Sequence, residues 1–287
     1  MKRQSEFVTN LNCIELIITY CCNRQCYNCQ AMVRQAPSKD AMTVEQIKKF
    51  ICETVEEKIK WNTIRIMGGE PTLHPNIEEI VRLLCEYRIQ YSVNTKIVIV
   101  TNGYGDYVES VIKSISDHYD IVIENSNKMS DYHEDFVEIN NAPLDLDLYD
   151  EDEYKRGCWI TSLCGIALDL HGYYMCSTAA AIDRVVGYDI GIKSLSRVPK
   201  SINTSREIFC KLCGHFNSKI NDAIDFNVNG ESDIQELNAI ISKRLENKLA
   251  YEETGFLKNE IYEPIISTFW NKALADYYIG RPILSKY

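Results

Sequence analysis

Residues 14–29 read IELIITYCCNRQCYNC, an apolar, β-branched run that leads directly into a cluster of cysteines. The run has the length and composition of a buried β-strand. The last three cysteines, at 22, 26 and 29, follow the spacing C-x3-C-x2-C. A cubane iron–sulfur cluster held by three thiolates keeps one iron open for a further ligand. We therefore expect a strand that ends in a metal-binding loop.

Strand and helix patterns alternate beyond this loop. Thr43 and Gln46 make a capping box at the start of one helical pattern, and a second begins at Pro75. A weaker helical pattern covers 106–117. Short β-branched runs, which we expect to be strands, occupy 63–67, 96–101 and 121–124. Alternation of this kind predicts an α/β fold, either a barrel or an open sheet with parallel strands and crossover helices.

Polar loops follow the predicted strands. Gly-Gly-Glu-Pro at 68–71 follows the second strand, Thr-Asn-Gly at 101–103 the third and Asn-Ser-Asn at 125–127 the fourth. Folds of this type place their active sites at the carboxyl ends of the strands. We therefore expect these loops and the cysteine loop to converge at one edge of the sheet.

Composition narrows the class of protein. The 287 residues are 45% apolar and 25% charged, as in globular proteins, and the net charge of −10 disfavours nucleic acid and anionic membrane surfaces as partners. No apolar stretch is long enough to cross a bilayer, and no secretory signal is visible, so we expect a cytoplasmic protein. Twelve cysteines in a reducing compartment indicate metal binding or catalysis rather than disulfides.

The cysteine loop and the Gly-Gly-Glu-Pro loop, in this order and each after a strand, resemble the radical S-adenosylmethionine (SAM) superfamily. The resemblance implies a partial (β/α) barrel of TIM type with about five to six strands. It also implies that three cysteines hold a [4Fe-4S] cluster whose open iron binds SAM, namely Cys22, Cys26 and Cys29.

The same resemblance assigns residues to SAM itself. The glycines of the second loop would let the backbone and the Glu70 carboxylate approach the ammonium of the methionyl group. Glu124, Asn125 and Ser126 are candidates for the ribose, and we favour Ser126. The SAM-binding residues that we expect are Gly68, Gly69, Glu70, Pro71, Asn102 and Ser126.

A second group of cysteines resembles the twitch domain, a shortened SPASM domain, in which a β-hairpin and a helix hold an auxiliary [4Fe-4S] cluster. Its expected ligands are Cys158, Cys176, Cys210 and Cys213, with Cys164 as the alternative to Cys158. Four cysteines are also a zinc pattern. We thus expect a radical SAM core over 1–157, a small α+β twitch-like domain over 158–220 and a helical tail over 221–287.

The resemblance implies an enzyme that forms a 5′-deoxyadenosyl radical and removes hydrogen from a small molecule, with electrons from a donor such as flavodoxin or ferredoxin. We favour oxidation of a small polyol, sugar or aminocyclitol to a ketone. One alternative is an epimerase of a sugar or aminoglycoside, with Cys164 as the catalytic hydrogen donor. A peptide-modifying maturase is less expected, because such enzymes usually carry a leader-binding domain before the first strand. A zinc or iron–sulfur protein without catalysis is the remaining alternative.

Overall fold

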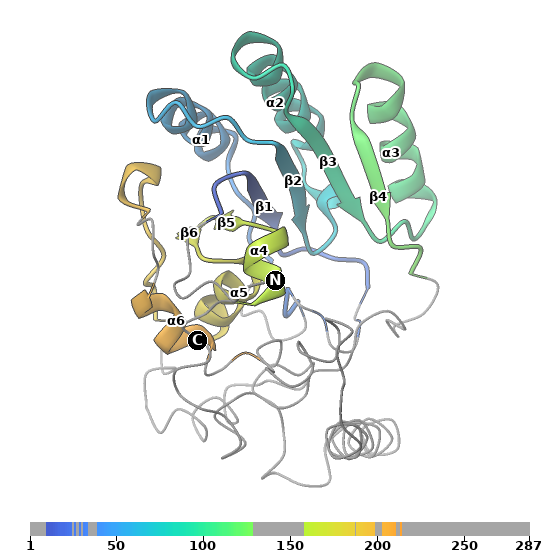
Figure 1. Ribbon diagram of the computed structural model, residues 1–287. Coiled ribbons are helices and arrows are strands. Elements are labelled where there is room, and N and C mark those ends of the chain that lie inside the picture. Colours follow the sequence, from blue (N-terminus) through green and yellow to red (C-terminus); the bar gives the residue numbers. More distant parts are fainter. Residues whose placement is uncertain are drawn as a thin grey trace, which may run out of the picture.

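The computed structural model describes residues 10–24, 26, 29, 31–33, 39–128, 158–186, 188–198, 203–210 and 213. These residues form one six-stranded sheet with the order β4-β3-β2-β1-β5-β6 (Figure 1). The strands are β1 (Cys13–Thr19), β2 (Thr63–Gly68), β3 (Lys96–Thr101), β4 (Val122–Asn125), β5 (Ile166–Asp169) and β6 (Gly172–Tyr174). All neighbouring pairs are parallel except β5 and β6. The sheet confirms the predicted α/β fold class of a partial barrel.

Three helices connect the first four strands and lie along one face of the sheet (Figure 1). They are α1 (Val44–Glu56), α2 (Ile77–Tyr91) and α3 (Asp106–His118). Ile14, Leu16 and Ile64 of the strands pack against this layer in one hydrophobic cluster. Thr43 caps α1 as predicted, because its hydroxyl accepts a hydrogen bond from the Gln46 backbone N–H at 3.2 Å.

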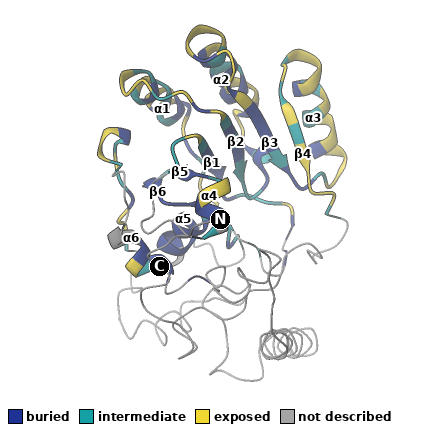
Figure 2. Cartoon of the chain, in the orientation of Figure 1, coloured by how far each residue is buried: buried dark blue, intermediate teal, exposed yellow. Residues whose placement is uncertain are grey.

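The opposite face of the sheet carries a second cluster, with α4 (Trp159–Leu163), α5 (Ser177–Val186) and α6 (Asn203–Phe209) on its side. Ile17 of β1 and Ala167 of β5 pack there against alanines of α5. The described side chains of α5 are almost entirely buried (Figure 2). Because side chains alternate along a strand, residues 15, 65 and 124 also face this side of the sheet.

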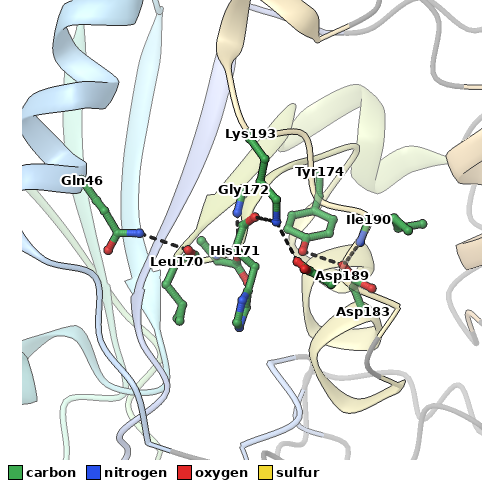
Figure 3. A network of polar contacts seen from close by, with 10 residues as sticks. Gln46, Leu170, His171, Gly172, Tyr174, Asp183, Asp189, Ile190 and Lys193 are labelled. Atoms are coloured by element: carbon green, nitrogen blue, oxygen red, sulfur yellow. Dashed lines mark hydrogen bonds and ion pairs between the residues drawn. The ribbon is translucent and has the colours of Figure 1, made fainter. Parts of the chain in front are cut away.

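A β-hairpin followed by a helix, expected for the second cysteine group, is present as β5, β6 and α5. The hairpin belongs to the core sheet, because β5 pairs in parallel with β1. Polar contacts fix it to the following segment (Figure 3). The Asp183 carboxylate accepts hydrogen bonds from the Tyr174 hydroxyl at 2.7 Å and the Ile190 N–H at 3.1 Å, and Lys193 Nζ donates to the His171 carbonyl at 2.7 Å.

The helical tail expected over 221–287 lies outside the described residues, as does the segment from 129 to 157. The predicted domain boundaries at 157 and 220 therefore stay predictions. Within the described ranges, no helix combines the length and the apolar character that a membrane crossing requires.

Candidate functional site

The loops at the carboxyl ends of β1 to β4 surround a cavity of about 610 Å³. The predicted residues that line it are Cys22, Cys26, Cys29, Gly68, Gly69, Asn102, Ser126 and Cys164. Two further predicted residues, Glu70 and Pro71, are buried behind its wall. The structure thus brings the cysteine loop and the three polar loops together, as the sequence predicts.

The cysteine loop places three thiols on one side of this cavity. Burial raises the pKa of Cys22 to about 11, and the neighbouring Cys29 and Cys26 add to the rise. The Asn102 side-chain amide lies 3.7 Å from the Cys22 sulfur. Buried thiols of this kind ionise when a metal coordinates them. The three cysteines therefore fit a metal cluster that faces the cavity.

Glycine is required where the second loop meets the cysteine loop. Gly68 has a φ of +151°, and a Cβ there would lie 2.1 Å from the Thr19 carbonyl oxygen. A Cβ on Gly69 would lie 2.3 Å from the Cys21 carbonyl oxygen. The two loops are joined by backbone hydrogen bonds from Gly69 N to Thr19 O and from Glu70 N to Cys21 O, both 2.8 Å. This part of the cavity wall is consequently made of backbone, which suits close approach of a ligand.

Glu70, which we expect to approach the ammonium of SAM, holds its carboxylate among protein donors. It is 0% exposed and does not line the cavity. Its Oε1 accepts hydrogen bonds from Thr72 N at 3.2 Å, Thr72 Oγ1 at 2.8 Å and Thr101 Oγ1 at 2.9 Å. Its Oε2 accepts one from Asn102 N at 2.8 Å. Glu70 thus ties the loop after β2 to the loop after β3.

Pro71 and Ser126 occupy different positions relative to the cavity. Pro71 is buried at the start of a short 3-10 turn, Pro71–Leu73, where its missing N–H is not needed. Ser126 lines the cavity, and its hydroxyl donates to the Thr101 carbonyl at 3.0 Å. Ser126 is therefore placed to contact a ligand, whereas Pro71 shapes the loop.

Three charged residues form the floor of the cavity, of which the sequence reasoning missed Glu15 and Arg65 and named Glu124 only as a ribose candidate. Arg65 of β2 donates from Nη1 to Glu15 Oε1 at 3.1 Å and from Nη2 to Glu124 Oε2 at 2.5 Å. Burial raises the pKa of Glu15, and its Ser177 hydrogen bond and the Arg65 charge oppose that rise. Burial lowers the pKa of Arg65, but the two carboxylates outweigh this and raise it overall. A glutamate inside the apolar β1 run is the signal that could have revealed this floor.

Cys164 directly follows α4 and lines the same cavity. Its sulfur lies 3.8 Å from Arg65 Nη1. Burial and the neighbouring Glu15 raise the pKa of Cys164 to about 12, against the opposing effect of Arg65. Cys164 is therefore a neutral thiol at pH 7, facing the floor of the cavity.

The other four predicted cysteines line a separate small apolar cavity, namely Cys158, Cys176, Cys210 and Cys213. Burial raises the pKa of Cys176 and of Cys210, and the neighbouring thiols add to both rises. Ile160 lines this cavity and also the larger one. In the described part of the chain, no three His, Cys, Asp or Glu side chains are grouped closely enough for a single metal ion.

Arg184 is a second feature that the sequence reasoning missed. From α5 it donates to the carbonyls of Ala31 and Met32, at 3.4 and 3.3 Å, just beyond the cysteine loop. Its guanidinium also lies 3.2 Å from the centre of the Tyr20 ring. An arginine in an alanine-rich helix gives no sequence signal for such a contact. Arg184 thereby connects α5 to the end of the cysteine loop.

Comparisons with known proteins agree with this arrangement. Residues 16–139 match the radical SAM superfamily. A GTP 3′,8-cyclase of Nautilia profundicola is 27% identical over 114 residues, which are 39% of this chain and 33% of that protein. A probable GTP 3′,8-cyclase of Pyrococcus horikoshii is 32% identical over 101 residues, 35% of this chain and 29% of that protein. The matched region thus spans about a third of the length of these relatives.

Among solved structures, BtrN in complex with AdoMet and 2-DOIA aligns with 71% of this chain and 89% of its own, at 14% identity and a TM-score of 0.44. The family match covers the cysteine loop and the Gly-Gly-Glu-Pro loop, which the structure places around one cavity. Members of this superfamily bind SAM at a [4Fe-4S] cluster. Residues 16–139 of this protein therefore form a radical SAM domain.

Proposed function

We propose that this protein is a radical SAM enzyme that oxidises a small hydroxylated molecule, such as a polyol, sugar or aminocyclitol, to a ketone. The observation that carries this proposal is the pair of adjoining cavities. One is lined by the three cysteines of the cysteine loop, beside the glycine-rich loop, and the other is lined by four cysteines, of which three are buried. Ile160 contributes to both cavities. A reaction in the first could therefore exchange electrons with a centre in the second.

The residues around the larger cavity fit the superfamily's cofactors. Cys22, Cys26 and Cys29 would hold the SAM-binding cluster, which when bound supplies the electron that cleaves SAM. Gly68 and Gly69 would present backbone to the methionyl group. Asn102 and Ser126 line the cavity at the loops after β3 and β4 and would orient the nucleoside. The chain's own task is to position the target carbon and to exclude water.

Oxidation of a carbinol needs an electron acceptor. Removal of the carbon-bound hydrogen atom leaves a carbon radical, and that hydrogen leaves with 5′-deoxyadenosine. The hydroxyl then loses a proton, one electron leaves the radical, and the C=O bond forms. A cluster ligated by Cys158, Cys176, Cys210 and Cys213 would accept that electron. Four thiolate ligands suit an electron carrier, because they leave no iron open to substrate.

A structural zinc ion is the alternative occupant of the four-cysteine cavity. Zinc binds four donors at about 2.3 Å from one ion. A cubane distributes its ligands over separate irons, so its thiolates need not converge on one point. The proposal also includes a flavodoxin or ferredoxin as the reductant and a cytoplasmic location.

Epimerisation is a second candidate, favoured by the position of Cys164. This thiol lines the larger cavity and stays protonated at pH 7. It could return a hydrogen atom to the substrate radical, so that the S–H bond breaks and a new C–H bond forms. The resulting sulfur radical would need one electron from the reductant and one proton from water before the next turnover.

Separate cysteine variants distinguish the two reactions. Holoenzyme, SAM and dithionite are incubated with a small-molecule extract in deuterated water, and mass spectrometry follows the products. We expect a product lighter by two hydrogen atoms. The variant with Cys210→Ala and Cys213→Ala should lose that product and retain SAM cleavage, because only the electron acceptor is removed. Cys164→Ala should still form it.

Cys52→Ala is the matched control, since Cys52 is an exposed thiol on α1 that lines neither cavity. The opposite effects of the two sets of variants would contradict oxidation and support epimerisation. In that case Cys164→Ala abolishes turnover, and the wild-type product gains one solvent deuterium without a change of oxidation state.

A further inference from the structure

The floor of the larger cavity is formed by charged side chains on the face of the sheet that carries α4, α5 and α6. It comprises Glu15 of β1, Arg65 of β2 and Glu124 of β4, which we call the charged floor. Glu15 pairs in register with Arg65, whereas Glu124 lies one inward position nearer the strand ends, opposite Val100. The loops that carry the cysteines and glycines begin where these strands end. The charged floor therefore lies below the SAM-binding loops.

The fold itself does not require these charges. The positions level with Arg65 and Glu15 on the neighbouring strands are Val98 and Ala167, both apolar. Glu15 is only 3% exposed. Burying an ion pair costs desolvation free energy, and apolar side chains of similar volume are often as stabilising or more so. Ionisable side chains that line a cavity and are not needed for packing are typical of ligand-binding sites.

The balance of charge indicates what kind of ligand the floor takes. Arg65 donates from one Nη atom to the Glu15 carboxylate and from the other to the Glu124 carboxylate. The formal charges of the three side chains add up to one negative charge. The Glu124 side chain remains 46% exposed. An ammonium group beside Glu124 would balance the surplus charge.

The cations of the cavity lie elsewhere. Arg24 belongs to the cysteine loop, where its guanidinium lies 4.2 Å from the centre of the Tyr104 ring. Lys128 follows β4, and its backbone N–H donates to the Asn102 carbonyl. Both cations therefore lie at the loops after the strands and not on the floor. An anionic substrate would meet surplus negative charge at the floor.

We propose that the charged floor selects a substrate in which a positively charged amine stands beside hydroxyl groups, and that it rejects phosphorylated molecules such as nucleotides. This inference rests on the proposed function, because it assigns the substrate class of the same cavity. The amine would contact Glu124, and a hydroxyl would face Arg65. Glu124 is the residue to test, since it is the accessible member of the floor.

The test compares charged and uncharged probes on SAM-loaded holoenzyme without reductant, by isothermal titration calorimetry. The pairs are 2-deoxystreptamine with myo-inositol and glucosamine with glucose, and GTP is the anionic probe. At least one amine should bind about tenfold more tightly than its uncharged counterpart, as expected for one partly desolvated charge contact. Glu124→Gln should remove that preference, and GTP should show no binding.

Glu109→Gln on α3 is the matched control, because it removes the same charge from an exposed position outside the cavity and should keep the preference. The proposal is overturned if no amine binds better than its counterpart, if Glu124→Gln keeps the preference, or if GTP binds. Iron content and reductive SAM cleavage of the same preparation test the proposed function separately. A preparation that cleaves SAM but shows no amine preference contradicts only the charged floor.

Discussion

Replacement of Cys22, Cys26 and Cys29 together by alanine is expected to abolish reductive SAM cleavage completely. These thiols lie on one side of the cavity beside the glycine-rich loop, and they would be the only protein ligands of the SAM-binding cluster. Without them SAM has no iron to bind and no electron to receive. Iron should fall from about eight to about four atoms per chain, since a second cubane is expected to remain. Iron analysis and chromatography of 5′-deoxyadenosine measure both effects.

The control for this variant is again Cys52→Ala, which removes a thiol from the exposed side of α1. It should leave the iron content and SAM cleavage as in the wild type. Formation of 5′-deoxyadenosine by the triple variant would show that another site carries the chemistry. A fall to no iron at all would show that the second cluster depends on the first loop.

Glu70→Gln is expected to destabilise the protein even in the absence of SAM. The Glu70 carboxylate accepts four hydrogen bonds from protein groups and is completely buried. The side-chain amide of glutamine keeps one acceptor oxygen. Its NH2 group replaces the other oxygen and cannot accept the hydrogen bonds on that side. Leaving a buried donor such as Asn102 N without an acceptor costs about 2 kcal/mol. The melting temperature should then fall by roughly 4–8 °C.

Thermal melts of the cluster-loaded protein with and without SAM separate two roles of Glu70. If it ties the loops together, as its contacts indicate, the melting temperature falls without SAM, and SAM affinity falls because the loop after β3 shifts. Glu109→Gln on exposed α3 should change neither value. If Glu70 instead contacts the SAM ammonium directly, the melting temperature without SAM stays at the wild-type value while the SAM dissociation constant rises.

The elements that sequence reasoning predicted well are those set by local patterns. The capping box at Thr43 and Gln46 fixes the start of α1, and β-branched runs fix β2 and β3 nearly to the residue. The loops that follow the strands converge, because parallel strands end at one edge of the sheet. The cysteine spacing and the Gly-Gly-Glu-Pro loop then identified the radical SAM domain.

The features that the sequence reasoning missed depend on contacts between distant segments. The pairing of Glu15 with Arg65 follows from the register of β1 and β2, which no local pattern specifies. Likewise, β5 joins β1 over a separation of about 150 residues, so the hairpin extends the core sheet. The partners of Glu70 were missed for the same reason, because Thr101 and Asn102 belong to the next loop.

A single assay of the wild-type protein tests directly whether this chain carries out radical SAM chemistry. The chain is reconstituted anaerobically with iron and sulfide, then incubated with SAM and dithionite, and the products are quantified by mass spectrometry. We expect 5′-deoxyadenosine and methionine in equal amounts, formed only when the reductant is present. An iron-loaded protein that forms neither product, or one that retains stoichiometric zinc in place of iron, would contradict this expectation.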